Sequence, residues 1–488
     1  MFSFEEIPTQ HVIPQIEVRS ADRCTALDVH QKLAGSGPSF LLDGAGWFGQ
    51  GRALSGVLPF AAFRSHGACS TFSYFGADGA HPEIWHDAAD PIVHLQRWLD
   101  RFTPPDTAFR AADRPLAHGG AIGFFSYDLV RQFERVPPHH INDPNLPDVL
   151  LFFFDLFIVS HCANGTPRIV FDPFPRMRMG QDAQAACRVG EAHINAVQQR
   201  LQAPQALETW APRAGVQYDL TPAAYEAYVR RVLGYIAAGD VFQVNLSHSM
   251  RAPGYVPAAS IYRRLSQINP SPFSAYLDMG EVQVACGSPE RLVCVRKREG
   301  RTWAETWPIA GTRPRGRTPE EDQAMVAALY ASRKEQAEHL MLVDLARNDL
   351  GRVCRFGSVD VTSLMGIEKY SHVIHLVSRV CGEVAPGTPP LSVLRALFPG
   401  GTITGVPKIR CMEIIAELEV RARGIYTGAI GYIGFDGQMD LNIAIRTWVR
   451  YRNEWTTQVG GGIVADSDPA AEYQETLQKA AALIAALQ

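Results

Sequence analysis

The chain has 488 residues, of which 46% are hydrophobic and 20% are charged, and its formal net charge is −4. This is the composition of a globular protein large enough for two closely packed domains. The charge is spread without a long basic run, so neither nucleic acid nor a membrane surface is an expected partner, and small molecules are the expected ligands.

The cysteines and the N-terminus bear on the compartment. The nine cysteines are odd in number and widely scattered, with no C-x-x-C pair, which favours buried thiols over disulfides or a zinc site. The N-terminus lacks the basic then apolar order of a signal peptide, and the longest apolar run, 149–160, is interrupted by Asp155. We therefore expect a cytoplasmic protein.

The clearest seam in the chain is the Pro-, Ala- and Gln-rich stretch 201–217. It predicts an N-terminal domain of residues 1–210 and a C-terminal domain of residues 211–488. Just beyond it, Thr221-Pro222 begins a helix whose apolar residues recur at helical spacing and which ends at Gly239.

Strands are predicted after this helix. Residues 241–247 alternate, which directs Phe242, Val244 and Leu246 to the core and Gln243 to a polar face. Asp436-Gly437 is typical of a hairpin turn. The further predicted strands are 281–286, 291–296, 301–306, 428–434 and 439–449.

Two helices follow capping signals. Thr318-Pro319-Glu320-Glu321 begins a helix that extends to Gly351 with a break near Ser332, and Asp468-Pro469 begins the last helix. Strands joined by hairpins, with helices gathered around them, favour an α+β architecture. Neither G-x-G-x-x-G nor G-x-x-x-x-G-K-[ST] follows a strand, which argues against dinucleotide and P-loop sites.

Carboxylates recur on one face of each of these two helices. Glu335 and Glu338 are three residues apart, as are Glu472 and Glu475, with Lys479 four residues further along. Carboxylates from separate helices suit a hard cation such as Mg²⁺ that keeps waters and also holds an anionic substrate. A solvated helix face is the commoner explanation for any one isolated glutamate.

Other residues suggest an anion site and proton transfer. Gly460-Gly461-Gly462 precedes the last helix, where backbone N–H groups can approach a carboxylate, although a glycine run is more often a tight turn. Arg446 lies on the polar side of its predicted strand. Glu290, in a turn between strands, is a candidate general acid, and His375 is a candidate proton shuttle or a structural histidine.

Taken in order, these motifs resemble those of the chorismate-utilising enzymes, a fold of antiparallel β-sheets surrounded by helices. The resemblance covers nearly all of residues 220–488. The stretches that carry it are GDVFQVNLS (239–247), NPSPF (269–273), SPERL (288–292), PIAGTRPRG (308–316), EHLMLVDLARNDL (338–350), GTITGVPK (401–408), IAIRT (443–447) and 460–479.

The resemblance implies a role for each residue. Glu338 and Glu475 would hold Mg²⁺ on the ring carboxylate of chorismate, with Glu335 and Glu472 nearby, and Glu290 would protonate the departing C4 hydroxyl. His375 and Thr402 are further candidate catalytic residues. The candidate substrate-binding residues are Gly311, Thr312, Tyr426, Arg446, Gly460, Gly461, Gly462 and Lys479.

Gln243 indicates the nucleophile. Water-adding relatives, the isochorismate and salicylate synthases, carry a lysine base at this position, whereas the aminating branch carries glutamine. The stretch 119–128 also resembles the N-terminal domain of that branch. We therefore expect ammonia to be added.

The aminating branch contains 4-aminating aminodeoxychorismate synthases and 2-aminating anthranilate synthases. Leu41-Leu42-Asp43, the stretches 131–135 and 149–161, and Gly400-Gly401 resemble the 4-aminating enzymes. Ala310 is typical of anthranilate synthases, whereas many 4-aminating enzymes have a nucleophilic lysine at this position. Thr402 likewise stands where the 4-aminating enzymes often have serine. We expect 4-amination, with anthranilate formation as the alternative.

No stretch resembles a glutaminase, so ammonia is expected from a separate glutamine amidotransferase subunit. The N-terminal domain could also contact that partner. A tryptophan-site region is expected at Leu42, Asp43 and Gly44 of that domain together with Pro272, Phe273 and Ser274. Gly44 replaces the expected serine, which argues against tryptophan regulation. A catalytically inactive regulatory paralogue is disfavoured because the carboxylates and cations are all present.

Overall fold

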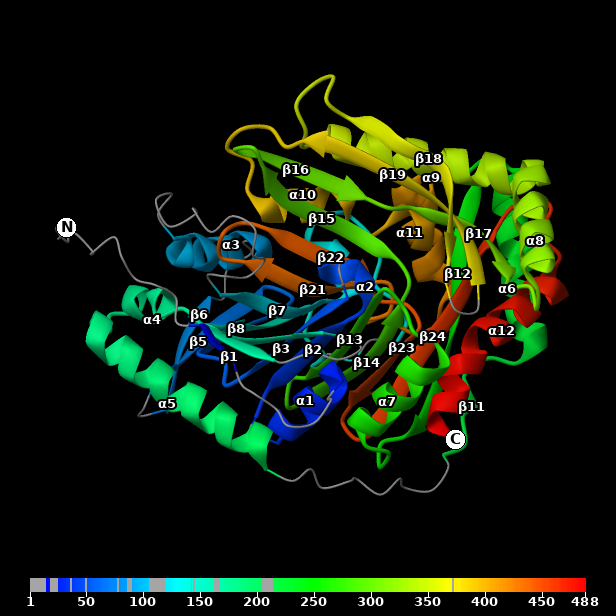
Figure 1. The fold of residues 1–488 in the computed structure, drawn as a ribbon. Helices are drawn as coiled ribbons and strands as arrows, with labels where there is room; N and C mark the ends of the chain where they lie inside the picture. The colour runs from blue at the N-terminus through cyan, green and yellow to red at the C-terminus, as the bar shows by residue number, and fades with distance from the viewer. Residues whose placement is uncertain are drawn as a thin grey trace.

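The structure is a computed structural model. It describes residues 15–17, 25–35, 37–48, 51–76, 79–85, 90–104, 119–141, 143, 145–161, 167–203 and 214–488 except 371–372. Two sheets of 12 strands each, all paired antiparallel apart from isolated bridges, lie against each other with helices around them, which confirms the α+β prediction (Figure 1).

The first sheet begins and ends with short strands. Its order is β1 (Gln15–Glu17), β10 (Arg168–Phe171), β9 (Leu156–His161), β3 (Arg52–Val57), β2 (Ser39–Asp43), β13 (Phe273–Asp278), β14 (Val282–Ser288), β23 (Thr447–Tyr451), β24 (Glu454–Ile463), β12 (Gln243–Pro253) and β11 (Gln217–Tyr218), with β20 (Gly405–Val406) beside β12.

The second sheet has the order β17 (Ile309–Pro314), β19 (Val373–Glu383), β16 (Arg301–Thr306), β15 (Arg291–Arg298), β22 (Met439–Ile443), β21 (Ala429–Gly434), β7 (Gly120–Phe125), β8 (Val149–Phe154), β4 (Ala61–His66), β5 (Cys69–Gly76) and β6 (Gly79–Trp85), with β18 (Asp360–Lys369) beside β19.

The helices cover the outer faces and the ends of the sheets (Figure 1). They are α1 (Ala26–Leu33), α2 (Ala45–Phe48), α3 (Pro91–Phe102), α4 (Phe174–Arg178), α5 (Ala183–Gln202), α6 (Pro222–Ala237), α7 (Ala258–Ile268), α8 (Pro319–Ala331), α9 (Arg333–Gly351), α10 (Pro390–Leu397), α11 (Lys408–Leu418) and α12 (Pro469–Leu487), with 3₁₀ turns η2 (Tyr127–Gln132) and η3 (Gly401–Ile403). Within the described residues, no helix is long and apolar enough to span a bilayer.

Strands from both halves of the sequence share each sheet. β2 pairs with β13, where Leu41 lies opposite Tyr276, and β7 pairs with β21, where Gly123 lies opposite Gly431. The predicted boundary near residue 210 lies outside the described residues, so the division into two domains stays a prediction.

The predicted helices are confirmed. Thr221, Thr318 and Asp468 cap α6, α8 and α12, and Ser332 both ends α8 and caps α9. The predicted strands are present, but two details were wrong, namely the burial of Phe242 and the continuity of 439–449. Phe242 precedes β12 and is 68% exposed, because the strand begins at Gln243.

The predicted strand 439–449 is two strands, β22 in the second sheet and β23 in the first. The break falls at residues 444–446, where Arg446 has a φ of 53°. Alternation alone cannot show such a crossing, because the side-chain pattern continues on both sides of it.

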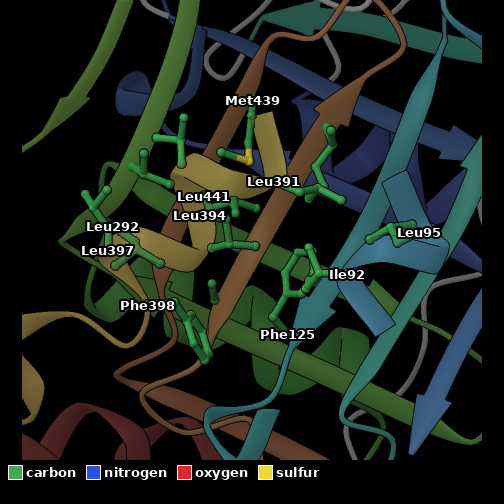
Figure 2. Close-up of a cluster of buried hydrophobic side chains, with 14 of the residues drawn as sticks. Ile92, Leu95, Phe125, Leu292, Leu391, Leu394, Leu397, Phe398, Met439 and Leu441 are labelled. Carbon is green, nitrogen blue, oxygen red and sulfur yellow. The ribbon is translucent and has the colours of Figure 1, made fainter. Parts of the chain in front are cut away.

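A large apolar core fills the space around the second sheet. In Figure 2 the α10 residues Leu391 and Leu394 lie against Met439 and Leu441 of β22, and all four are at most 1% exposed. This packing fixes β22 immediately before the crossing at residue 444.

Candidate active site

Two chain segments cross from one sheet to the other side by side. β14 passes into β15 through Pro289 and Glu290, and β22 passes into β23 through residues 444–446. The Gly287 amide donates to the Arg446 carbonyl at 3.0 Å, and the Ile443 amide donates to the Glu290 carbonyl at 3.0 Å. These two hydrogen bonds join the crossing segments that carry Glu290 and Arg446.

Glu290 is 5% exposed. Its Oε1 accepts a hydrogen bond from the Ile309 amide at 3.3 Å. Burial raises the pKa of Glu290 to about 7, against the smaller lowering effects of Thr402 and the Ile309 amide. A carboxyl group in this state can hold a proton at neutral pH and donate it.

On α9, Glu338 and Glu335 point toward the same region. Gln243 Nε2 donates to Glu338 Oε1 at 2.6 Å, and Arg313 Nη1 donates to Glu335 Oε1 at 2.5 Å. Glu335 Oε2 is buried and has no hydrogen-bond partner among the described residues. Burial raises the pKa of Glu338, and the charges of Glu475 and Glu335 raise it further.

On α12, Glu475 and Glu472 face the glycine loop. Lys479 Nζ lies 2.8 Å from Glu475 Oε1 and donates to the Gly460 carbonyl at 3.0 Å. A Cβ built on Gly461 would lie 3.5 Å from Glu472 Oε2, 3.6 Å from Lys479 Nζ and 3.7 Å from Glu475 Oε1. The loop thus borders the acidic cluster closely.

The two acidic pairs meet across Gly462 and Gln243. A Cβ on Gly462 would lie 2.3 Å from Gln243 Nε2 and 3.4 Å from Glu338 Oε1, so a larger residue here would displace the Gln243 amide from Glu338. No three His, Cys, Asp or Glu side chains of the described ranges stand in metal-binding positions as they are oriented.

The remaining predicted residues surround this cluster. Gly311, with a φ of 79°, forms a bulge in β17 between Ala310 and Thr312. Thr312 Oγ1 lies 3.0 Å from His375 Nδ1, and burial lowers the pKa of His375 to about 4, which keeps it neutral.

Tyr426 is buried, and Arg446 is half-buried beside it in this group. Burial raises the pKa of Tyr426 to about 12 and lowers the pKa of Arg446, whose charge also interacts with Tyr426 and Glu475. Among the described residues no carboxylate forms an ion pair with this half-buried arginine, so its guanidinium is suited to an anionic ligand.

The Trp47 side chain packs against two residues of the predicted tryptophan-site region, Phe273 and Ser274. The Trp47 side chain of α2 is fully buried, donates from Nε1 to the Ser274 carbonyl at 2.8 Å, and lies edge-on to Phe273 at 5.3 Å. A Cβ at Gly44 would lie 2.5 Å from the Pro272 carbonyl oxygen. A serine at position 44 would therefore require the chain to move.

Sequence reasoning did not single out Trp47, Arg313 or the buried pair of Asp349 and Lys408, whose Oδ2 and Nζ lie 2.6 Å apart. Arg313 and Asp349 lie inside the quoted motifs, but their contacts join residues far apart in the sequence. No local pattern reports such a contact.

Comparisons with known proteins identify the family. A family model described as "chorismate binding enzyme" matches residues 60–485. The chain is 40% identical to anthranilate synthase component 1 of Thermus thermophilus over 98% of each chain, and 38% identical to aminodeoxychorismate synthase component 1 of Bacillus subtilis over 89% of each.

A solved structure is also similar. Anthranilate synthase component I from Streptococcus pneumoniae, 29% identical, superimposes with a TM-score of 0.76 and covers 96% of this chain and 100% of that one. The chain belongs to the chorismate-binding enzyme family, as a chorismate-utilising enzyme of the anthranilate synthase and aminodeoxychorismate synthase type.

Proposed function

We propose that this protein is the component I subunit that aminates chorismate at C4, using ammonia from a glutamine amidotransferase partner, to give 4-amino-4-deoxychorismate. The observation that carries the proposed chemistry is the buried carboxyl group of Glu290 at the sheet crossing. Glu290 protonates the departing C4 hydroxyl, which leaves as water.

The carboxylates fit Mg²⁺. The donor set is all oxygen, Glu335 Oε2 is buried and has no hydrogen-bond partner among the described residues, and the charges of Glu475 and Glu335 help to raise the pKa of Glu338, so a bound cation would stabilise this cluster. Glu338 and Glu475 would hold it, with Glu335 and Glu472 nearby. When bound, it would neutralise the ring carboxylate of the substrate and stabilise charge as the hydroxyl leaves.

The protein's own cations and backbone hold the substrate. Arg446 and Lys479 would pair with its carboxylates, the glycine loop at 460–462 admits a carboxylate close to the backbone, and Tyr426 and Thr312 would orient the ring. His375 would hold the Thr312 hydroxyl in place.

The identity of the nucleophile follows from Gln243. Its amide contacts Glu338 and carries no basic group, so it cannot deprotonate water, whereas ammonia needs no such base. This supports amination over hydroxylation. Ammonia would arrive from a separate subunit, in keeping with the component 1 names of the relatives.

Two local features support C4. The Gly400-Gly401 pair resembles the corresponding stretch of the 4-aminating enzymes. Trp47 packs against Phe273 and Ser274, where a tryptophan effector is expected, which argues against the tryptophan regulation typical of 2-aminating enzymes. Without a lysine at Ala310, ammonia itself would react at C2 first, or C4 would react without that intermediate.

Anthranilate formation is the second candidate. Ala310 lies in β17 next to the bulge at Gly311, and anthranilate synthase component 1 of Thermus thermophilus is similar over 98% of the chain. In that reaction ammonia adds at C2 while the C4 hydroxyl leaves, so Glu290 would serve the same purpose.

Product analysis separates the two. Purified protein is given chorismate, Mg²⁺ and ammonium, with and without an aminodeoxychorismate lyase. We expect 4-aminobenzoate only when the lyase is present. Anthranilate fluorescence without the lyase would establish the second candidate, and no consumption of chorismate would contradict both.

A further inference from the structure

Three side-chain oxygen atoms of the candidate active site are buried and have no hydrogen-bond partner of acceptable geometry among the described residues. They are Gln243 Oε1, Asn245 Oδ1 and Thr402 Oγ1. Sequence reasoning gives no role to Asn245. A buried polar atom without a partner costs free energy, so a ligand that carries hydrogen-bond donors is expected at these oxygens.

The free oxygens of the two amides are fixed by what their nitrogens contact. Gln243 Nε2 donates to Glu338 Oε1 at 2.6 Å, and Asn245 Nδ2 donates to the Thr402 carbonyl at 3.3 Å. A turned amide would place its oxygen against another oxygen, so the nitrogens keep these contacts. The Thr402 hydroxyl lowers the pKa of Glu290, as a donor to that carboxylate does, and its oxygen keeps lone pairs that can accept.

The three oxygens lie in one part of the site. Gln243 and Asn245 are two residues apart on the same face of β12. Asn245 lies opposite Gly462 in the sheet, and a Cβ on Gly462 would lie 3.3 Å from Gln243 Cδ. The Gln243 side chain therefore leans along the strand toward Asn245. The Asn245 amide in turn contacts Thr402, which lies beside Glu290.

The hydrogen-bonding capacity of this group matches ammonia better than water. Ammonia has three N–H donors and one lone pair, whereas water has two O–H donors and two lone pairs. Because the nitrogens of both amides are already engaged, the three side chains offer acceptors to a ligand. Three acceptors satisfy every N–H group of ammonia and leave its lone pair free to react.

We propose that Gln243, Asn245 and Thr402 together bind the ammonia molecule that attacks chorismate; the proposal rests on the amination proposed above. Their oxygens accept its three N–H groups, and its lone pair is directed away from them, toward the substrate. Asn245 and Thr402 are therefore specificity-determining residues for the nucleophile. The site serves amination at C4 and at C2 alike.

The test removes single oxygens with little change in side-chain size. Asn245→Leu and Thr402→Val each delete one acceptor, whereas Thr402→Ser keeps the hydroxyl. Asn195→Leu, at an exposed position of α5, is the control for the asparagine substitution. Thermal melting shows that each variant is folded. Rates are then measured with chorismate, Mg²⁺ and ammonium at mildly alkaline pH, where free ammonia is present.

We expect Asn245→Leu and Thr402→Val each to raise the KM for ammonium roughly tenfold, while the KM for chorismate stays unchanged. Thr402→Ser restores the affinity for ammonium, and Asn195→Leu behaves as wild type. Nitrogen NMR gives a second measurement that needs no turnover. The wild type and Asn195→Leu broaden the signal of isotope-labelled ammonium, and Asn245→Leu broadens it less.

Other results overturn the proposal. A KM for ammonium in Asn245→Leu equal to that in Asn195→Leu contradicts it, and so does equal NMR broadening by these two variants. A parallel rise in the KM for chorismate would mean that the oxygens hold chorismate instead. If only one of the two oxygen deletions has an effect, the three-oxygen site is wrong. Failure of the proposed function appears separately, as anthranilate in place of the 4-amino product or as no chorismate consumption by the wild type.

Discussion

The carboxyl group of Glu290 is buried where the chain crosses from one sheet to the other. Burial raises its pKa from 4.5 to about 7, so the native protein retains this proton at a pH where the unfolded chain has lost it. Stability contributed by this proton is present below pH 4.5 and is lost as the pH rises toward 7. Because catalysis requires the protonated acid, activity should fall as the pH rises above about 7.

The first prediction concerns Glu290→Gln. The amide cannot donate an acidic proton, so kcat is expected to fall about 10²–10⁴-fold, with little change in folding. The decrease in unfolding free energy between pH 4.5 and 7 should also be smaller than in wild type. Denaturant unfolding across this pH range measures it, and parallel curves for the two proteins would contradict the raised pKa.

The second prediction concerns the acidic cluster. Glu338→Gln removes one proposed cation ligand and relieves repulsion with Glu335 and Glu475, so it should weaken Mn²⁺ binding at least about tenfold without lowering the melting temperature. Calorimetric titration with Mn²⁺ measures this. Glu321→Gln on α8, 43% exposed in its side chain, is the control and should bind as wild type does.

At the scale of elements, α12 carries Glu472, Glu475 and Lys479, and Asp468 begins it by accepting from the Ala471 amide at 2.9 Å. Asp468→Ala should cost about 1 kcal/mol of stability and weaken Mn²⁺ binding, because the first turn holds Glu472. Asp182→Ala removes the equivalent cap of α5, where Asp182 accepts from Ala185 at 2.7 Å. It should cost similar stability and leave Mn²⁺ binding unchanged; equal effects on binding would contradict the prediction.

Helix α2 leads to a prediction about regulation. Because Trp47 occupies the interior beside Phe273, added tryptophan should change neither the activity nor the melting temperature of the wild type. Trp47→Ala should cost about 3–5 kcal/mol of stability, and tryptophan should then raise its melting temperature by filling the space. Isothermal titration of both proteins measures this, and tight binding to the wild type would contradict it.

Local signals predicted the elements better than their connections. The caps Thr221, Ser332 and Asp468 each act within three residues, so the helix ends could be predicted from the sequence. The crossing at Arg446 could not, because β22 and β23 have the alternation of one strand and differ only in the sheet they join. Gln243 and Glu338 are 95 residues apart in the sequence, so no local pattern predicts their contact, and only the resemblance to a family places both residues in one site.

At the scale of the whole molecule, the functional site depends on sheets that both halves of the sequence build. Sheet order places β2 beside β13 in the first sheet and β7 beside β21 in the second. The Arg291–Asp440 pair, 2% and 0% exposed, further ties β15 to β22 within the second sheet. The predicted domains at 1–210 and 211–488 would therefore be linked by continuous hydrogen-bonded sheets.

This linkage predicts the behaviour of the separated halves. Expressed alone, residues 211–488 would expose the edges of β13 and β21, whose apolar side chains and free backbone groups favour aggregation. Co-expression with residues 1–210 should restore a soluble complex that binds Mn²⁺ and consumes chorismate. A monomeric 211–488 fragment that unfolds cooperatively near the melting temperature of the full chain would instead show that the catalytic half folds independently, and that β2 and β7 only extend sheets that are already stable.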